Sequence, residues 1–175
     1  MAILARINQI SLRWTDLKKR FKKGADVEIS DYLDERLVLF LDAPSRDDAL
    51  AQLIQALAQR NRLKDVKRFH EAILDREKIV STGVGLGVAI PHAKLKGYSD
   101  FFIAIGILQN RGVDWNALDG CAVRLVFLIG GPDDQQTEYL KILSHVTMAI
   151  KSEERRKKLL KATDPQEVIA LFAEC

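Results

Sequence analysis

The sequence predicts an α/β fold in which a mixed β-sheet is flanked by helices on both sides. Two continuous apolar runs, residues 101–108 and 122–129, are typical of strands buried on both faces. Helical patterns of apolar residues precede and follow these runs, so the order is strand, helix, helix, strands and helices. This order favours helices packed on both faces of one sheet.

The composition fits one globular domain with a short extension. The 175 residues are 47% hydrophobic and 29% charged, which is enough for a sizeable core. No apolar run has the length of a transmembrane helix or the character of a signal peptide. Cys121 and Cys175 are too few for a disulfide framework or a zinc site, so we expect a cytoplasmic protein with reduced thiols.

Residues 1–28 are predicted to form an amphipathic basic helix, and residues 29–175 the main domain. Seven basic and three acidic residues give the N-terminal segment a charge of +4, which leaves −1 on the rest of the chain. Its apolar residues recur at steps of three and four: Ile3, Ile7, Ile10, Trp14, Leu17 and Phe21. Such a helix packs on the main domain or self-associates with a second copy, and a membrane surface is an alternative. A nucleic-acid partner ranks last, because no aromatic interleaving supports it.

The main domain begins with a strand and two helices. Residues 36–41 are a compact apolar run typical of a strand. Ser45 and Asp48 have the spacing of a capping box that opens the first helix. Apolar residues share one side of this helix: Leu50, Leu53, Ile54 and Leu57. The apolar side of the second helix consists of Val66, Phe69, Ile73 and Leu74.

Later elements alternate with glycine-containing turns. A short strand ends at Ile90, and Pro91 places His92 just past the strand end. Residues 130–132 (GGP) are expected to end the second long strand. The helix that follows has an apolar side of Tyr139, Leu140, Leu143, Val146 and Ile150. Residues 153–161 form a short charged helix, and the last helix opens with Asp164 as cap and Pro165 at its first position.

The candidate site lies in residues 76–94. Three glycines, Gly83, Gly85 and Gly87, leave backbone N–H groups free to approach an anion. Arg76, the hydroxyls of Ser81 and Thr82, and the imidazole of His92 flank them. Together these groups are suited to handling a phosphoryl group.

Other chemistries fit this stretch poorly. A Rossmann fingerprint needs a strand before its glycines and the spacing G-x-G-x-x-G, whereas here a helix precedes G-x-G-x-G. No G-K-[ST] of a Walker loop and no nucleophile elbow occurs. His70 and His145 lie on separate predicted helices, which argues against a metal site. Two interpretations of His92 remain. It has a structural or surface role, or its neutral imidazole acts as a nucleophile through one ring nitrogen while the N–H of the other nitrogen is bound by an acceptor.

Residues 76–92 read REKIVSTGVGLGVAIPH, and this run closely resembles the IIA domains of the bacterial phosphoenolpyruvate:sugar phosphotransferase system, of the fructose/mannitol type. Within that group the sequence looks most like the nitrogen-related regulatory IIA proteins. The resemblance extends over residues 29–172, including D-x-x-x-V-x-L-V-F at residues 119–127. It does not cover the basic N-terminal segment.

The resemblance implies that His92 is phosphorylated, at Nε2, by a phosphohistidine carrier of the HPr or NPr type. The phosphoryl group would then pass to a IIB domain or serve as a regulatory signal. Arg76 matches the active-site arginine that neutralises phosphoryl charge, and Thr82 with the glycine backbone would frame the phosphoryl group. Donor and acceptor are both protein side chains, so the resemblance implies no metal and no organic cofactor.

One position departs from the family pattern. The family usually has a second histidine near the start of the helix after the last long strand, where this chain has Tyr139. A tyrosine can hydrogen-bond a phosphoryl oxygen but does not titrate near neutral pH. We therefore expect His92 to accept phosphate and onward transfer to be slower or absent, in line with a regulatory phosphocarrier. The alternatives are a sugar-specific IIA component with a separate IIB, and a non-catalytic partner-binding module on the IIA fold.

Overall fold

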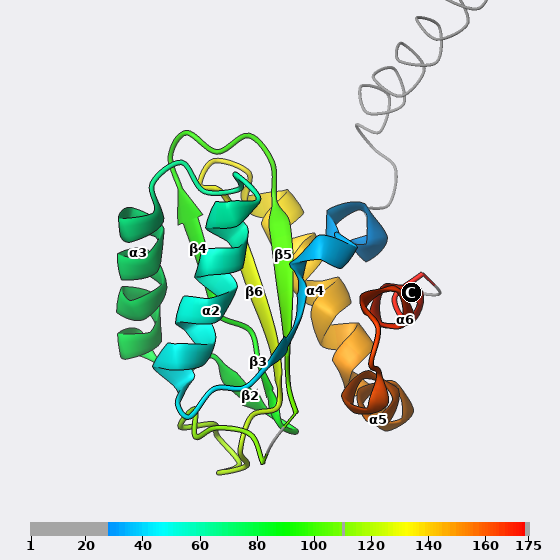
Figure 1. Ribbon diagram of the computed structural model, residues 1–175. Coiled ribbons are helices and arrows are strands. Elements are labelled where there is room, and N and C mark those ends of the chain that lie inside the picture. Colours follow the sequence, from blue (N-terminus) through cyan, green and yellow to red (C-terminus); the bar gives the residue numbers. More distant parts are fainter. Residues whose placement is uncertain (1–27, 110, 174–175) are drawn as a thin grey trace, which may run out of the picture.

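The computed structural model describes residues 28–109 and 111–173, which form a six-stranded mixed sheet between two layers of helices (Figure 1). In chain order the elements are η1 (Ile29–Tyr32), η2 (Glu35–Leu37), β1 (Val38–Leu41), α2 (Arg46–Gln59), α3 (Val66–Ile79), β2 (Gly83–Gly85), β3 (Val88–Ala89), β4 (His92–Leu95), β5 (Phe102–Leu108), β6 (Leu125–Pro132), α4 (Gln136–Lys151), α5 (Glu153–Lys161) and α6 (Pro165–Ala170). The predicted α/β class is confirmed. The predicted N-terminal helix lies outside the described residues, except for Glu28.

The sheet is mixed because its two central strands, β5 and β6, are antiparallel to each other and each pairs in parallel with its outer neighbours. The strand order is β1-β5-β6-β3-β2, and β4 also pairs with β6. Strand β5 runs antiparallel to β6, whereas β1 is parallel to β5, and both β3 and β4 are parallel to β6. Helices α2 and α3 cover one face, and α4, α5 and α6 cover the other (Figure 1).

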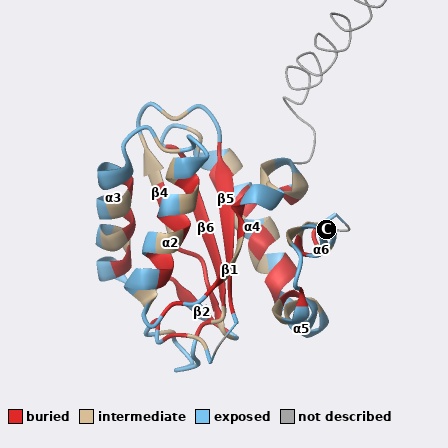
Figure 2. Ribbon diagram, viewed as in Figure 1, coloured by how far each residue is buried: buried red, intermediate tan, exposed pale blue. Residues whose placement is uncertain are grey.

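The two long central strands are buried along their whole length, as their continuous apolar runs predict (Figure 2). Successive side chains of a strand point to opposite faces. In β5, Ile103, Ile105 and Ile107 therefore join the core under α4, whereas Ala104 and Leu108 join the core under α2 and α3. Among the described residues, no helix has the length and apolar character needed to cross a membrane.

The second long strand is shifted from its predicted position. It begins at Leu125 instead of residue 122, and it continues through Gly130, Gly131 and Pro132, which were expected to end it. Aromatic rings explain the glycines: a Cβ on Gly130 would lie 2.3 Å from the ring of Phe102, and one on Gly131 would lie 2.2 Å from the ring of Phe101. The rings occupy the space of the missing side chains, so glycine here permits packing and does not break the strand.

Of the predictions about element boundaries and apolar helix sides, some are confirmed and some are wrong. Ser45 and Asp164 are N-caps as predicted, and each accepts a hydrogen bond from a backbone N–H in the first turn. Residues 36 and 37 belong to the 3₁₀-helix η2 and not to the first strand. Val66 and Leu140, both predicted on apolar sides, are 44% and 52% exposed. Val66 is the first residue of α3, and Leu140 follows Tyr139, which takes the inward direction on α4.

Candidate functional site

His92 lies at a break in what is otherwise one strand along β6. Strands β3 and β4 pair with β6 in the same register, with Ala89 opposite Val126 before the break and His92 opposite Ile129 after it. At the break Pro91 has no N–H to donate, but its carbonyl accepts the N–H of Ile129 at 2.9 Å. His92 is therefore the first residue of β4, which corrects the prediction of a position just past a strand end.

Both ring nitrogens of His92 have partners, which determines the tautomer. Nδ1 lies 2.9 Å from the carbonyl oxygen of Ile90, and Nε of Arg76 donates to Nε2 at 3.1 Å. A carbonyl can only accept and an arginine N–H can only donate, so Nδ1 carries the proton and Nε2 has the lone pair, which accepts the Arg76 N–H. Arg76 is held in turn by the carbonyl of Val80, 3.0 Å from Nη1. The structure thus brings together Arg76 and His92, which are both sequence-predicted site residues.

The surroundings of His92 favour its neutral form. Burial lowers the pKa of this imidazole below its ordinary value of 6.5, and the positive charges of Arg76 and Lys94 lower it further. The hydrogen bond to Ile90 and the carboxylate of Glu77 act in the opposite direction without reversing the effect. The ring is therefore neutral at pH 7, with Nε2 available as a nucleophile.

We expect a pH titration of the chain to show this lowered pKa directly. A histidine whose pKa is lowered stays neutral until the pH falls through that lowered value, so the His92 ring should remain neutral below pH 6.5. NMR titration of the imidazole Hε1 resonance measures the pKa. A midpoint for His92 at or above 6.5 would contradict the geometry.

A hollow of about 490 Å³ lies beside the imidazole. Its lining comes from α3, β4 and α4: Ala72, Asp75, Arg76, Ile79, His92, Ala93, Lys94 and Tyr139. Lys94 lies two residues beyond His92 on β4, so both side chains point to the same side of the strand. Two cations, Arg76 and Lys94, thus border the hollow that His92 lines, an arrangement that suits an anionic group.

Tyr139 forms one wall of the hollow. Its ring centroid is 5.6 Å from that of His92 and 6.3 Å from that of Phe101, and the ammonium of Lys94 lies 4.7 Å above its ring. The ammonium also donates to the side-chain oxygen of Gln136. Burial raises the pKa of the Tyr139 hydroxyl, so this group stays protonated near neutral pH.

The remaining predicted residues are not among those that line the hollow. Thr82 is buried, and its hydroxyl and N–H both donate to the carboxylate of Glu77. Gly83 and Gly85 form the short strand β2, where the N–H of Gly83 donates to the hydroxyl of Ser81. Gly87, with a φ of 73°, follows the turn and accepts hydrogen bonds from the N–H groups of residues 124 and 125. A direct role of these four residues in phosphoryl binding stays a prediction.

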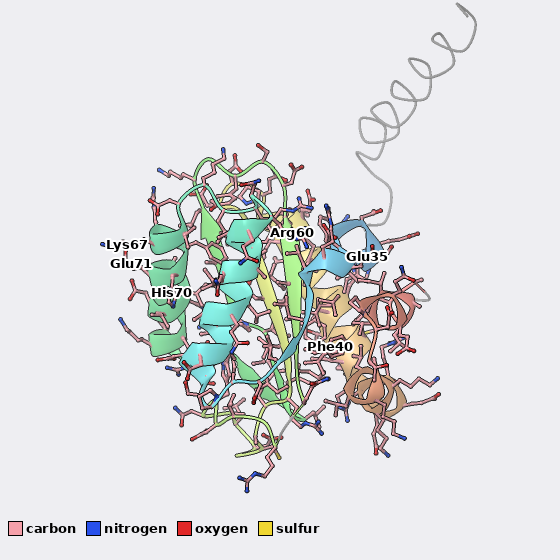
Figure 3. The ribbon with its side chains drawn as sticks, viewed as in Figure 1. Glu35, Phe40, Arg60, Lys67, His70 and Glu71 are labelled. Atoms are coloured by element: carbon pink, nitrogen blue, oxygen red, sulfur yellow. The ribbon has the colours of Figure 1, made fainter. Side chains whose placement is uncertain are left out.

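The other two histidines, His70 and His145, take no part in the hollow. His70 lies on α3 (Figure 3) and is half-buried, and neither it nor His145 on α4 is among the residues that line the hollow. Within the described ranges, no three His, Cys, Asp or Glu side chains converge as metal ligands would. Among the residues that line the hollow, His92 is the one histidine.

Sequence reasoning missed three contributors to the site. The position of Lys94 two residues after His92 was a usable signal, because the prediction of a strand there would have placed both on one side. A large aromatic residue in a polar loop was the signal for Trp115, which is fully buried and donates from Nε1 to the Thr82 hydroxyl at 3.2 Å. Glu77 follows Ile73 by four residues on the apolar side of the same helix, and this position was a usable signal for its burial.

Comparison with known proteins identifies the family. The model of the family "Phosphoenolpyruvate-dependent sugar phosphotransferase system, EIIA 2" matches residues 31–175. The chain belongs to this family. Residues 76–92, which carry the resemblance seen in the sequence, are those that build the end of α3, the β2–β3 hairpin and the break before His92.

Relatives of this EIIA chain carry two kinds of name. The chain is 33% identical over 147 residues to the fructose-specific EIIABC component of Bacillus subtilis, an alignment that covers 83% of the chain and 23% of that protein. It is 32% identical over 139 residues to a nitrogen regulatory protein of Bradyrhizobium diazoefficiens, covering 79% of the chain and 90% of that protein. The chain thus spans less than a quarter of the first relative and most of the second.

A solved structure supports the EIIA fold. The crystal structure of the nitrogen regulatory protein IIA-Ntr from Neisseria meningitidis superposes with a TM-score of 0.76 at 28% identity. The superposition covers 82% of this chain and 98% of that one. Almost the whole of the known domain is therefore present here, and the segment of this chain before residue 31 lies outside the family match.

Proposed function

We propose that this EIIA chain is a phosphocarrier that accepts a phosphoryl group on Nε2 of His92. The observation that carries the proposal is the state of the imidazole: Nδ1 donates to the Ile90 carbonyl, so the lone pair is on Nε2, next to the guanidinium of Arg76. The lowered pKa of His92 keeps that lone pair available at pH 7. The donor would be a phosphohistidine protein of the HPr or NPr type, which also makes the proposed location cytoplasmic.

The transfer requires Arg76 to change partner. The lone pair of Nε2 cannot accept the Arg76 N–H and attack phosphorus at the same time, so this N–H must turn to a phosphoryl oxygen. As the new N–P bond forms at Nε2, the N–P bond of the donor breaks and the donor nitrogen keeps the electron pair. Nδ1 stays hydrogen-bonded to Ile90, which stabilises the positive charge that the ring gains.

The test of this proposal is incubation with phosphoenolpyruvate, enzyme I and HPr, followed by detection of acid-labile, alkali-stable phosphate. We expect the chain to be labelled, His92→Gln to remain unlabelled, and His70→Gln, which does not line the hollow, to be labelled like the unmodified chain. Absence of label on the unmodified chain would overturn the phosphocarrier function, and label on His92→Gln would overturn the site.

Two kinds of protein could accept the phosphoryl group from His92: a IIB domain or a regulatory target. Relatives include both a nitrogen regulatory protein and a fructose-specific component, so the family alone fits a regulatory role and a sugar-transport role. Tyr139 favours regulation. Near neutral pH its hydroxyl beside His92 stays protonated, so it neither titrates in this range nor carries a positive charge during onward transfer. The acceptor would then be a regulatory target and not a IIB domain.

Tyr139→His is expected to restore onward transfer. A second imidazole beside His92 can carry a proton near neutral pH, so we expect at least a severalfold faster loss of phosphate to a fructose-type IIB domain, with an unchanged rate of labelling by HPr. Tyr139→Phe serves as the control, since it removes the hydroxyl and keeps the ring. Equal transfer rates for the histidine variant and the unmodified chain would show that Tyr139 does not limit this step.

The N-terminal segment is proposed to act apart from the phosphocarrier domain. Residues 29–175 contain every group of the site, so deletion of residues 1–24 should leave labelling intact. If the segment mediates self-association, the deletion should lower the sedimentation coefficient to that of a monomer. An unchanged oligomeric state would remove self-association from the proposal.

A further inference from the structure

Glu77 is a buried acidic residue in the last turn of α3, and the transfer described above does not use it. The residue is 6% exposed. One carboxylate oxygen accepts the N–H of Thr82 at 2.9 Å, and the other accepts the Thr82 hydroxyl at 2.6 Å. A buried carboxylate is unfavourable unless such bonds compensate its lost hydration. The two bonds therefore join the end of α3 to the segment before β2.

Thr82 connects Glu77 to Nδ1 of the imidazole. The carbonyl of Thr82 accepts the N–H of Ile90 at 3.0 Å, and the carbonyl of Ile90 lies 2.9 Å from Nδ1 of His92. Trp115 supports the same residue, because its indole N–H donates to the Thr82 hydroxyl at 3.2 Å. The Ile90 carbonyl, which determines the tautomer of His92, is therefore positioned by Glu77 through Thr82.

A second connection reaches Nε2 through the helix itself. Arg76 precedes Glu77, and its guanidinium bridges the Val80 carbonyl and Nε2 of His92. Val80 lies between Glu77 and Thr82 in the chain. The two hydrogen bonds from Thr82 to the Glu77 carboxylate therefore close residues 77–82 into a short loop that contains Val80. This loop fixes the carbonyl that orients Arg76.

We propose that Glu77 is a positioning residue for phosphoryl transfer, which fixes the His92 imidazole through Thr82 and Ile90 on one side and through Arg76 on the other. The inference rests on the proposed function of His92, and it adds a residue that touches neither the phosphoryl group nor the imidazole. Small displacements of a nucleophile from its attacking geometry reduce rates strongly. Glu77 therefore acts on the rate of transfer and not on the binding of the donor protein.

The charge of Glu77 gives the proposal a second readout. The titratable groups that face the site are Asp75, Arg76 and Glu77 of α3, Lys94 of β4 and Tyr139 of α4. Among them, Glu77 raises the pKa of His92, whereas Arg76 and Lys94 lower it. Removal of the negative charge of Glu77 should therefore move the pKa of His92 further down, so that protonation of the ring begins at a lower pH.

Glu77→Gln tests the proposal with little change in shape. We expect the maximal rate of phosphorylation by phospho-HPr to fall by about tenfold, while the half-saturating concentration of phospho-HPr stays the same. NMR titration should show a lower pKa for His92 than in the unmodified chain. Glu71→Gln is the matched control: Glu71 lies on the outer side of α3 next to Lys67 (Figure 3), is paired with it at 3.9 Å, and should change neither quantity.

Thr82→Val decides the matter if Glu77→Gln does not fold. It keeps the backbone N–H and the volume of the side chain but removes the hydroxyl bond to Glu77, so the maximal rate should again fall without a change in half-saturation. Normal rates in the folded Glu77→Gln variant together with an unchanged pKa of His92 would overturn the inference, as would normal rates in Thr82→Val. Absence of label on the unmodified chain would instead overturn the proposed function, so the two failures are distinguishable.

Discussion

Arg76→Gln should reduce phosphorylation of His92 by about a hundredfold, the usual loss when one donor to a developing anionic charge is removed. Glutamine lacks the positive charge and cannot bridge the Val80 carbonyl and Nε2 of His92 as the guanidinium does. A single-turnover reaction with labelled phospho-HPr measures the rate. Arg76→Lys should fall in between, because it keeps the charge and loses the two-pronged geometry.

The control for this variant is Arg68→Gln. Arg68 lies on the same helix, its side chain is exposed, and it does not line the hollow. We expect Arg68→Gln to be phosphorylated at the normal rate, which excludes a general effect of charge on docking of the donor. A rate for Arg76→Gln within threefold of normal would contradict the assigned role of the arginine.

Trp115→Ala should lower the free energy of unfolding by about 3–5 kcal/mol, the usual cost of removing a buried aromatic side chain. Trp115 is fully buried, its indole N–H donates to Thr82, and its carbonyl accepts the hydroxyl of Ser81 at 2.6 Å. The alanine variant leaves a cavity and removes the donor to Thr82. Urea denaturation followed by circular dichroism gives the difference in stability.

Two variants bracket this result. Trp115→Phe keeps an aromatic ring in the core and removes the N–H, so its loss should be smaller, about 1–2 kcal/mol. Leu118→Ala lies in the same loop, where Leu118 is 88% exposed, and should be as stable as the unmodified chain. If Trp115→Ala loses no more than Leu118→Ala, the indole does not hold this loop to the body.

The sequence was most informative where local chemistry decides the structure. The burial of β5 on both faces follows from its continuous apolar run, and the starts of α2 and α6 follow from Ser45 and Asp164 as caps. The structure also brings the predicted site residues Arg76 and His92 into contact at 3.1 Å, although 16 positions separate them in the chain.

Predictions failed where a distant neighbour decides the outcome. Gly130 and Gly131 continue β6 because the rings of Phe102 and Phe101 fill the space beside them, and no local rule shows which rings will lie there. The continuation of β3 as β4 depends in the same way on pairing with β6 across Pro91. A direct role of Gly83, Gly85 and Gly87 in phosphoryl binding stays a prediction, and in the structure β2 and the turn after it form hydrogen bonds of their own.

The most direct test of the account is NMR of the phosphorylated chain with ¹⁵N-labelled histidine. Because Nδ1 of His92 donates to the Ile90 carbonyl and Nε2 has the lone pair, the account predicts a ³¹P–¹⁵N coupling to Nε2 of His92, with Nδ1 still protonated. A phosphoryl group on Nδ1 of His92, or on His70 or His145, would contradict it.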